Sequence, residues 1–318
     1  MDRLQQSIIR TVAYFDIFHH PMKPAEIRSF LDMRCSEQEL NRSLAALVKE
    51  KILFRSATFY QLKHDDSIAA ERIKANALAE KHMIKARKIA AFLACFPFIK
   101  GIAVSGSLSK KIATVKSDYD FFIITQKNCL WLSRFMFSVF IKAASLVGLK
   151  KYFCLNYIID ESYLEVEEKN IFTAIETVTL MPMYGGRIFT AFFAANNWAY
   201  DFFPNHEFIE HGIEDESKNI FTRFAEWLMY NKIGQKADDV IMHFFEKRWR
   251  KLKAKKKVTG SGFMLGSMMV DKHYCKPYPQ HFQREILLKY EERIANIAAV
   301  IPAEIQQHSH LLQREIIK

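Results

Sequence analysis

Residues 104–122, VSGSLSKKIATVKSDYDFF, place a Gly-Ser pair ten residues ahead of an Asp-x-Asp motif. A short apolar run, Gly101–Ser105, leads into the pair, and a stronger one, Tyr119–Thr125, overlaps the motif. Both runs are typical of buried β-strands. Aspartate disfavours strand formation, so two of them at the start of an apolar strand indicate a functional requirement.

This pattern has a direct chemical interpretation. A glycine at position 106 lets the backbone approach a phosphate, and a helix N-terminus and the Ser107 hydroxyl can bind the phosphate oxygens. The period of two in a strand places the Asp118 and Asp120 carboxylates on one face. Mg²⁺ prefers such oxygen ligands and shares them with substrate phosphates. The stretch therefore predicts a combined phosphate and magnesium site.

The N-terminal residues predict three helices followed by a hairpin. Pro24 suits the first turn of the second helix, and Ser36 with Glu39 forms a capping box ahead of the third. Short β-prone runs at residues 52–54 and 59–62 complete the order. This order resembles a winged helix-turn-helix domain over residues 1–65.

The third helix of this unit has an outward face of mixed charge. We therefore expect a scaffold or protein-docking role in preference to sequence-specific DNA binding. The face comprises Glu37, Gln38, Asn41, Arg42 and Lys49.

The rest of the chain divides by composition. Residues 66–97 predict a connecting helix, and residues 98–205 predict a strand-rich core with helices after it. An apolar helix is expected over residues 130–147, where Arg134 and Lys142 oppose membrane insertion. Residues 152–159 predict a third core strand. Beyond Glu161 the pattern is helical, so residues 206–318 are expected to form an all-α region.

The Gly-Ser and Asp-x-Asp pattern, in its strand–turn–helix–strand context, resembles the polymerase-β-type nucleotidyltransferase superfamily. That superfamily includes DNA polymerase β, aminoglycoside nucleotidyltransferases and small bacterial toxin–antitoxin enzymes. The resemblance spans about 60 residues, 101–160, and the tail that follows is similar to those of bacterial nucleotidyltransferase-domain proteins. It implies an α+β fold: a small mixed-sheet core between the winged-helix-like domain and the all-α C-terminal region.

The resemblance also implies a reaction and its residues. Asp118 and Asp120 would coordinate Mg²⁺, with Mn²⁺ as a substitute. An acceptor hydroxyl would attack the α-phosphorus of an NTP, expected to be ATP, so that AMP is transferred and pyrophosphate leaves. The nucleotide would be bound by Gly106, Ser107, Ser109 and Lys110.

One expected residue departs from the superfamily pattern. A third carboxylate usually lies on the next core strand, and the corresponding position here is Asn156. An asparagine can ligate a metal weakly but cannot act as a base. The acids Asp160, Glu161, Glu165 and Glu176 are the alternatives for completing the site.

The predicted function is thus a cytoplasmic, Mg²⁺-dependent nucleotidyltransferase whose acceptor is a small molecule, a protein or RNA. One alternative is a degenerate nucleotide-binding regulator that acts through the winged helix. Another is a toxin–antitoxin-type enzyme that modifies a partner protein. The five cysteines include no CxxC pair, which fits reduced thiols in the cytoplasm.

The net charge of +11 is concentrated in one segment. Residues 247–257 contain eight basic residues and no acid, which leaves +3 for the remaining chain. The segment is either a solvated helix end or the binding site of an anionic partner such as tRNA or a membrane surface.

Overall fold

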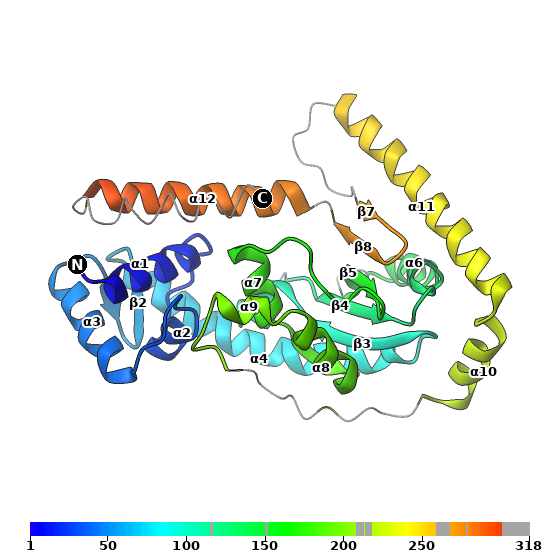
Figure 1. Ribbon diagram of the computed structural model, residues 1–318, viewed down its shortest axis with the longest axis horizontal. Helices are drawn as coiled ribbons and strands as arrows, with labels where there is room; N and C mark the ends of the chain where they lie inside the picture. The colour runs from blue at the N-terminus through cyan, green and yellow to red at the C-terminus, as the bar shows by residue number, and fades with distance from the viewer. Residues whose placement is uncertain are drawn as a thin grey trace.

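The computed structural model describes residues 1–114, 117–149, 152–207, 213, 218–258, 268–277 and 279–300. It is an α+β fold, as predicted, in which a helical N-terminal unit lies beside a six-stranded mixed sheet (Figure 1). None of the helices in these ranges is both long enough and apolar enough to cross a membrane.

The N-terminal unit has the predicted order of elements. It comprises α1 (Arg3–Asp16), α2 (Pro24–Ser29), α3 (Glu37–Lys49) and the antiparallel hairpin of β1 (Phe54–Ser56) and β2 (Phe59–Gln61). The predicted capping box of α3 is present: the backbone N–H of Glu39 donates to Ser36 Oγ at 3.2 Å, and that of Ser36 donates to Glu39 Oε2 at 2.8 Å.

The predicted connecting helix is α4 (Asp66–Ala94), which links this unit to the sheet. Its buried positions include five alanines, which allow close packing against neighbouring elements. The Arg72 side chain is 3% exposed. Its guanidinium donates to Glu26 Oε1 at 2.7 Å, contacts His20 Nδ1 at 2.7 Å and reaches the Lys110 carbonyl oxygen at 3.4 Å. Arg72 therefore joins the N-terminal unit to the loop that follows the Gly-Ser turn.

The sheet has the order β6-β3-β4-β5-β8-β7. Its centre is formed by β3 (Ile99–Val104), β4 (Asp120–Thr125) and β5 (Cys154–Asp160). β3 and β4 are antiparallel, whereas β4 and β5 are parallel. A parallel pair requires a crossover, and α6 (Leu130–Leu146) provides it. This is the apolar helix expected over residues 130–147, and it buries Trp131 and Phe137.

Three further strands extend this sheet. β6 (Met181–Tyr184) pairs with β3, and the hairpin of β7 (Met268–Val270) and β8 (Tyr274–Pro277) pairs with β5. The prediction of an all-α C-terminal region is therefore wrong. Each of these strands has three or four residues, which is too short to show a period of two, and β6 and β8 contain proline, which is unfavourable within a sheet.

The remaining helices surround the sheet and the N-terminal unit. They are α5 (Gly106–Ser109), α7 (Ile171–Val178), α8 (Gly186–Ala195), α9 (Trp198–Asp201), α10 (Ile220–Met229), α11 (Lys232–Val258) and α12 (Pro279–Val300).

The C-terminal helix α12 returns along α1 (Figure 1). The Tyr14 and Tyr290 rings lie 5.6 Å apart, edge to face, and Arg293 forms an ion pair with Asp16. One hydrophobic core combines residues of α1, α7 and α12. The N-terminal unit is consequently packed into the rest of the chain.

Candidate active site

The Gly-Ser turn follows β3 and the Asp-x-Asp motif leads into β4, and these two antiparallel strands pair with each other, so the turn and the motif lie side by side. The backbone N–H of Ser105 donates to the carbonyl oxygen of Asp120 at 2.9 Å. Gly106 has φ +67°, and a Cβ there would lie 2.6 Å from Asp120 Oδ2. Only glycine fits this close approach of the turn to a carboxylate.

The turn continues into α5, a helix of a single turn. Ser109 Oγ and Lys110 Nζ each donate to the Gly106 carbonyl oxygen at 3.0 Å. The backbone N–H of Ile112 donates to the Ser107 carbonyl oxygen at 2.9 Å. These bonds hold the turn in place and leave the Ser107 side chain exposed.

The turn opens into a cavity of about 680 Å³, a volume in the usual range for small-molecule sites. One end is polar, and it is lined by Ser105, Gly106, Ser107, Lys110, Asp120 and Glu176. The rest is mostly apolar, with Tyr14, Phe15, Phe18, Phe122, Tyr157, Val166, Phe172, Leu180, Phe192 and Phe282 in its walls. Residues of the N-terminal unit, the sheet and α12 thus enclose one site.

Charged side chains at the polar end of the cavity interact with one another. Lys110 Nζ lies 2.8 Å from Glu176 Oε1, so this lysine connects α7 to the turn. Burial raises the pKa of the Asp120 carboxyl, and the negative charges of Asp118 and Glu176 raise it further, while a hydrogen bond from the Cys154 thiol and the Lys110 charge oppose the shift. Asp120 is thus a half-buried acid close to other acids, a position where a bound cation would stabilise its charged form.

The residues predicted from the motif are brought together in part. Gly106, Ser107, Lys110 and Asp120 line the cavity. Asp118 is exposed and is not part of the lining, although its charge acts on Asp120. Ser109 is turned back onto the Gly106 carbonyl.

The position expected to carry a third acid lies at an irregularity of the sheet. Leu155 pairs with Phe121 and Tyr157 pairs with Phe122, so the backbone of Asn156 falls where the register shifts. The side chain of Asn156 lies outside the described part of the structure.

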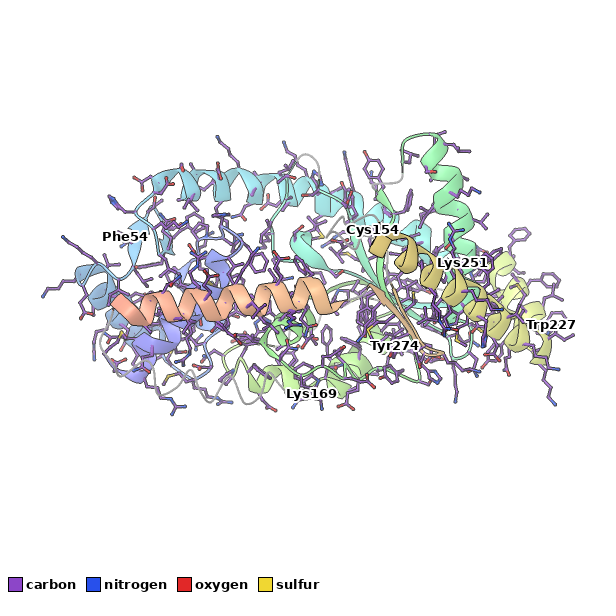
Figure 2. The ribbon with its side chains drawn as sticks, turned by 90° about the horizontal axis from the view of Figure 1, so that it is seen from above. Phe54, Cys154, Lys169, Trp227, Lys251 and Tyr274 are labelled. Atoms are coloured by element: carbon purple, nitrogen blue, oxygen red, sulfur yellow. The ribbon has the colours of Figure 1, made fainter. Side chains whose placement is uncertain are left out.

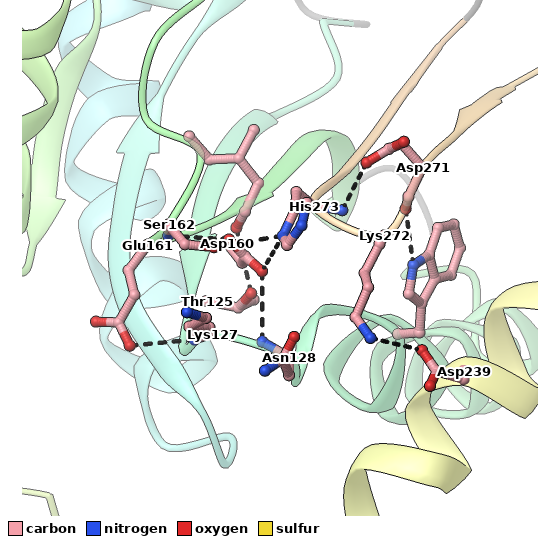
Figure 3. A network of polar contacts seen from close by, with 12 residues as sticks. Thr125, Lys127, Asn128, Asp160, Glu161, Ser162, Asp239, Asp271, Lys272 and His273 are labelled. Atoms are coloured by element: carbon pink, nitrogen blue, oxygen red, sulfur yellow. Dashed lines mark hydrogen bonds and ion pairs between the residues drawn. The ribbon is translucent and has the colours of Figure 1, made fainter.

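The structure distinguishes among the alternative acids. Asp160 is fully buried at the far end of β5, where it accepts hydrogen bonds from Ser162 Oγ at 2.6 Å and the Asn128 backbone N–H at 3.3 Å and contacts His273 Nδ1 at 2.9 Å (Figure 3). This network joins β5 to the β7–β8 hairpin and does not line the cavity.

The surface acids are also engaged elsewhere. Glu161 accepts a hydrogen bond from the Lys127 backbone N–H at 3.1 Å, and Glu165 forms an ion pair with Lys169 at 2.6 Å. Glu176 is the one acid among the four alternatives that lines the cavity beside Asp120. Sequence reasoning could include Glu176 as a candidate but could not select it, because it reaches the site only through the packing of α7.

Sequence reasoning missed a second ion pair in the cavity. Lys276 Nζ on β8 lies 2.7 Å from both carboxylate oxygens of Glu168 and 5.9 Å from the centre of the Tyr157 ring. Lys276 is 5% exposed. Its strand was not predicted, so no sequence signal pointed to it.

A preformed cluster of metal ligands is not part of this arrangement. Within the described ranges, no three His, Cys, Asp or Glu side chains are grouped so that they could hold a metal ion. Mg²⁺ bound by one or two carboxylates, with substrate phosphates as its other ligands, does not need such a cluster.

Comparison of the chain with protein-family models, curated proteins and solved structures found no match.

Proposed function

We propose that this protein is a nucleotidyltransferase that moves an NMP, with AMP from ATP as the expected case, to a hydroxyl acceptor. One observation carries the proposal: the positive-φ Gly106 turn lies directly against the half-buried Asp120 carboxylate, at the polar end of a cavity large enough for a nucleotide. A phosphate-binding turn beside a carboxylate is the arrangement that phosphoryl chemistry requires.

The turn would bind the triphosphate. Ser107 presents an exposed hydroxyl to the cavity, and Gly106 has no side chain to keep a phosphate away. Lys110 supplies a positive charge between the turn and Glu176. A bound triphosphate would compete with Glu176 for this ammonium group, which would free the Glu176 carboxylate.

Asp118 and Asp120 would hold Mg²⁺ together with the phosphates. The raised pKa of Asp120 is consistent with this role, since a cation would offset the burial and the neighbouring negative charges that cause the shift. When bound, the ion would neutralise charge at the phosphates and stabilise the leaving pyrophosphate.

Glu176 is our candidate for orienting the acceptor and accepting its proton. It lines the cavity from α7, and its carboxylate lies 2.8 Å from Lys110 Nζ, which also contacts the turn. A carboxylate in this place supplies the base that Asn156 cannot supply.

The N-terminal unit contributes to the same cavity. Tyr14, Phe15 and Phe18 of α1 and the turn that follows it line the wall. This favours a structural role for the winged-helix-like unit in forming the acceptor or base pocket, over a role as a DNA reader.

Label transfer tests the proposal. The purified protein is incubated with Mg²⁺, a cell lysate and each of four NTPs labelled at the α-phosphate. Asp118→Ala/Asp120→Ala is the test variant, and Glu165→Ala is the control, because the exposed Glu165 side chain pairs with Lys169 and does not line the cavity. We expect transfer by the wild type and the control, and none by the double variant. Equal transfer by the double variant would refute the site, and nucleotide binding without transfer would favour the regulator alternative.

A further inference from the structure

The helices α10 and α11 expose an unusual number of large apolar side chains. On α10, Phe221 is 82% exposed and Trp227 is 74% exposed, with Ile220, Phe224 and Leu228 beside them. On α11, Ile233 is 81% exposed. Trp227 projects from the outer edge of the molecule (Figure 2). Contiguous exposed apolar side chains of this kind mark an interaction surface.

The orientation of α10 is fixed by its polar side. Thr222 Oγ1 donates to the Cys95 carbonyl oxygen at 2.8 Å, and the backbone N–H of Phe98 donates to Glu226 Oε1 at 2.6 Å. Lys218 forms an ion pair with the same glutamate. A helix of a soluble protein normally turns its apolar side inward. Here polar contacts hold the helix with its apolar side outward.

The helix α11 continues this surface. Its inner side packs Phe245 and Trp249 against Trp131 of α6, at ring distances of 5.8 and 6.1 Å. Exposed positions at helical spacing form an outer stripe that starts apolar and becomes basic towards the C-terminal end. The stripe consists of Ile233, Lys236, Val240, Phe244, Lys247 and Lys251.

The acids of α11 contribute little negative charge to this surface, because one is buried and two are paired with cations. Asp238 accepts a hydrogen bond from the Leu132 backbone N–H at 2.8 Å. Asp239 pairs with Lys272 at 3.0 Å, and Glu246 pairs with Arg250. The exposed cations here are Arg223, Lys232, Lys236, Lys247, Arg248 and Lys251.

We propose that the surface formed by α10 and the outer stripe of α11 binds an anionic lipid bilayer, with both helices lying in the interface. Aromatic and aliphatic side chains would enter the boundary between headgroups and acyl chains, while the flanking Lys and Arg side chains contact acidic headgroups. A nucleic acid would match the cations but would leave the apolar side chains of Phe221 and Trp227 exposed to water. The inference is independent of nucleotidyl transfer.

Vesicle flotation tests this inference on the full chain. Phosphatidylcholine vesicles with and without phosphatidylserine serve as probes. Phe221→Ser/Trp227→Ser removes apolar contacts, and Lys247→Gln/Lys251→Gln removes charge. Ile73→Ser/Ile84→Ser is the matched control, because these residues are 54% and 61% exposed on α4.

We expect the wild type and the control to float only with the anionic vesicles. Each test variant should bind at least tenfold more weakly, because it removes either two basic contacts to acidic headgroups or two aromatic contacts to the acyl chains. High salt should weaken the wild-type binding. Failure to bind anionic vesicles, or equal binding by all variants, would overturn the proposal. A concentration-dependent dimer that Phe221→Ser/Trp227→Ser abolishes, without lipid binding, would assign the surface to a second copy of this chain instead.

Discussion

The substitution Gly106→Ala tests the geometry of the site, and Gly148→Ala is its matched control. Gly106 and Gly148 have similar positive φ values, +67° and +74°. A Cβ at Gly106 would lie 2.6 Å from Asp120 Oδ2, whereas a Cβ at Gly148 would meet nothing within 4 Å. The two substitutions therefore share the backbone strain, and only the first one disturbs the carboxylate.

The expected magnitudes follow from these contacts. An alanine in the left-handed region costs about 1–2 kcal/mol, and about 0.4–1 kcal/mol of this is offset because the unfolded chain loses freedom. We expect each variant to lose about 1 kcal/mol of unfolding free energy. At Gly106 the Asp120 carboxylate must also move, so nucleotide affinity in the presence of Mg²⁺ should fall at least tenfold, or ~1.4 kcal/mol.

Urea unfolding and calorimetric titration with MgATP measure the two effects. Gly148→Ala should bind nucleotide like the wild type, and Gly106→Ala should not. Equal nucleotide affinity in the two variants would show that the contact between the turn and Asp120 has no part in binding.

Three further predictions follow from individual residues. Glu176→Gln should lower turnover about 100-fold or more with little change in nucleotide affinity, as measured by steady-state kinetics, because it removes a base and keeps the shape. Burial raises the pKa of Asp238 to about 7 from 3.8. The folded chain then binds a proton more tightly than the unfolded chain, so the unfolding free energy should fall by about 4 kcal/mol as pH rises from about 4 to 7. Asp238→Asn should flatten that dependence in urea titrations, and an unchanged slope would contradict it. Arg72→Met should cost about 2 kcal/mol of unfolding free energy, since it breaks a buried ion pair with Glu26; a loss close to zero in the same titrations would contradict this.

Local patterns predicted the parts of the fold that are specified locally. The capping box at Ser36 depends on two residues that are three positions apart. A glycine favours a turn with positive φ, as at Gly106, and an aspartate pair at the start of an apolar run marks the strand that begins at Asp120. These features therefore appear in the structure where the sequence indicated them.

The site residues that the sequence could not predict are those brought to the cavity by packing between distant parts of the chain. Glu176 reaches the cavity through α7, and Lys276 reaches it through β8, a strand of four residues that pairs with β5 more than a hundred residues earlier in the chain. Asp160 matched the expected type and strand of a third acid, but it belongs to the network with His273. Spacing along one strand could not show which end of the sheet opens into the cavity.

Nucleotidyl transfer at the Asp118/Asp120 site can be checked by following which phosphate of ATP is transferred. The protein is given Mg²⁺ and the lysate with ATP labelled at either the α- or the γ-phosphate, and the macromolecular and small-molecule products are separated. We expect label from the α-phosphate to appear in product and label from the γ-phosphate to leave as pyrophosphate, and we expect Asp118→Ala/Asp120→Ala to lose both signals. Transfer of the γ-label to product, or α-label transfer that persists in the double variant, would contradict nucleotidyl transfer at this site.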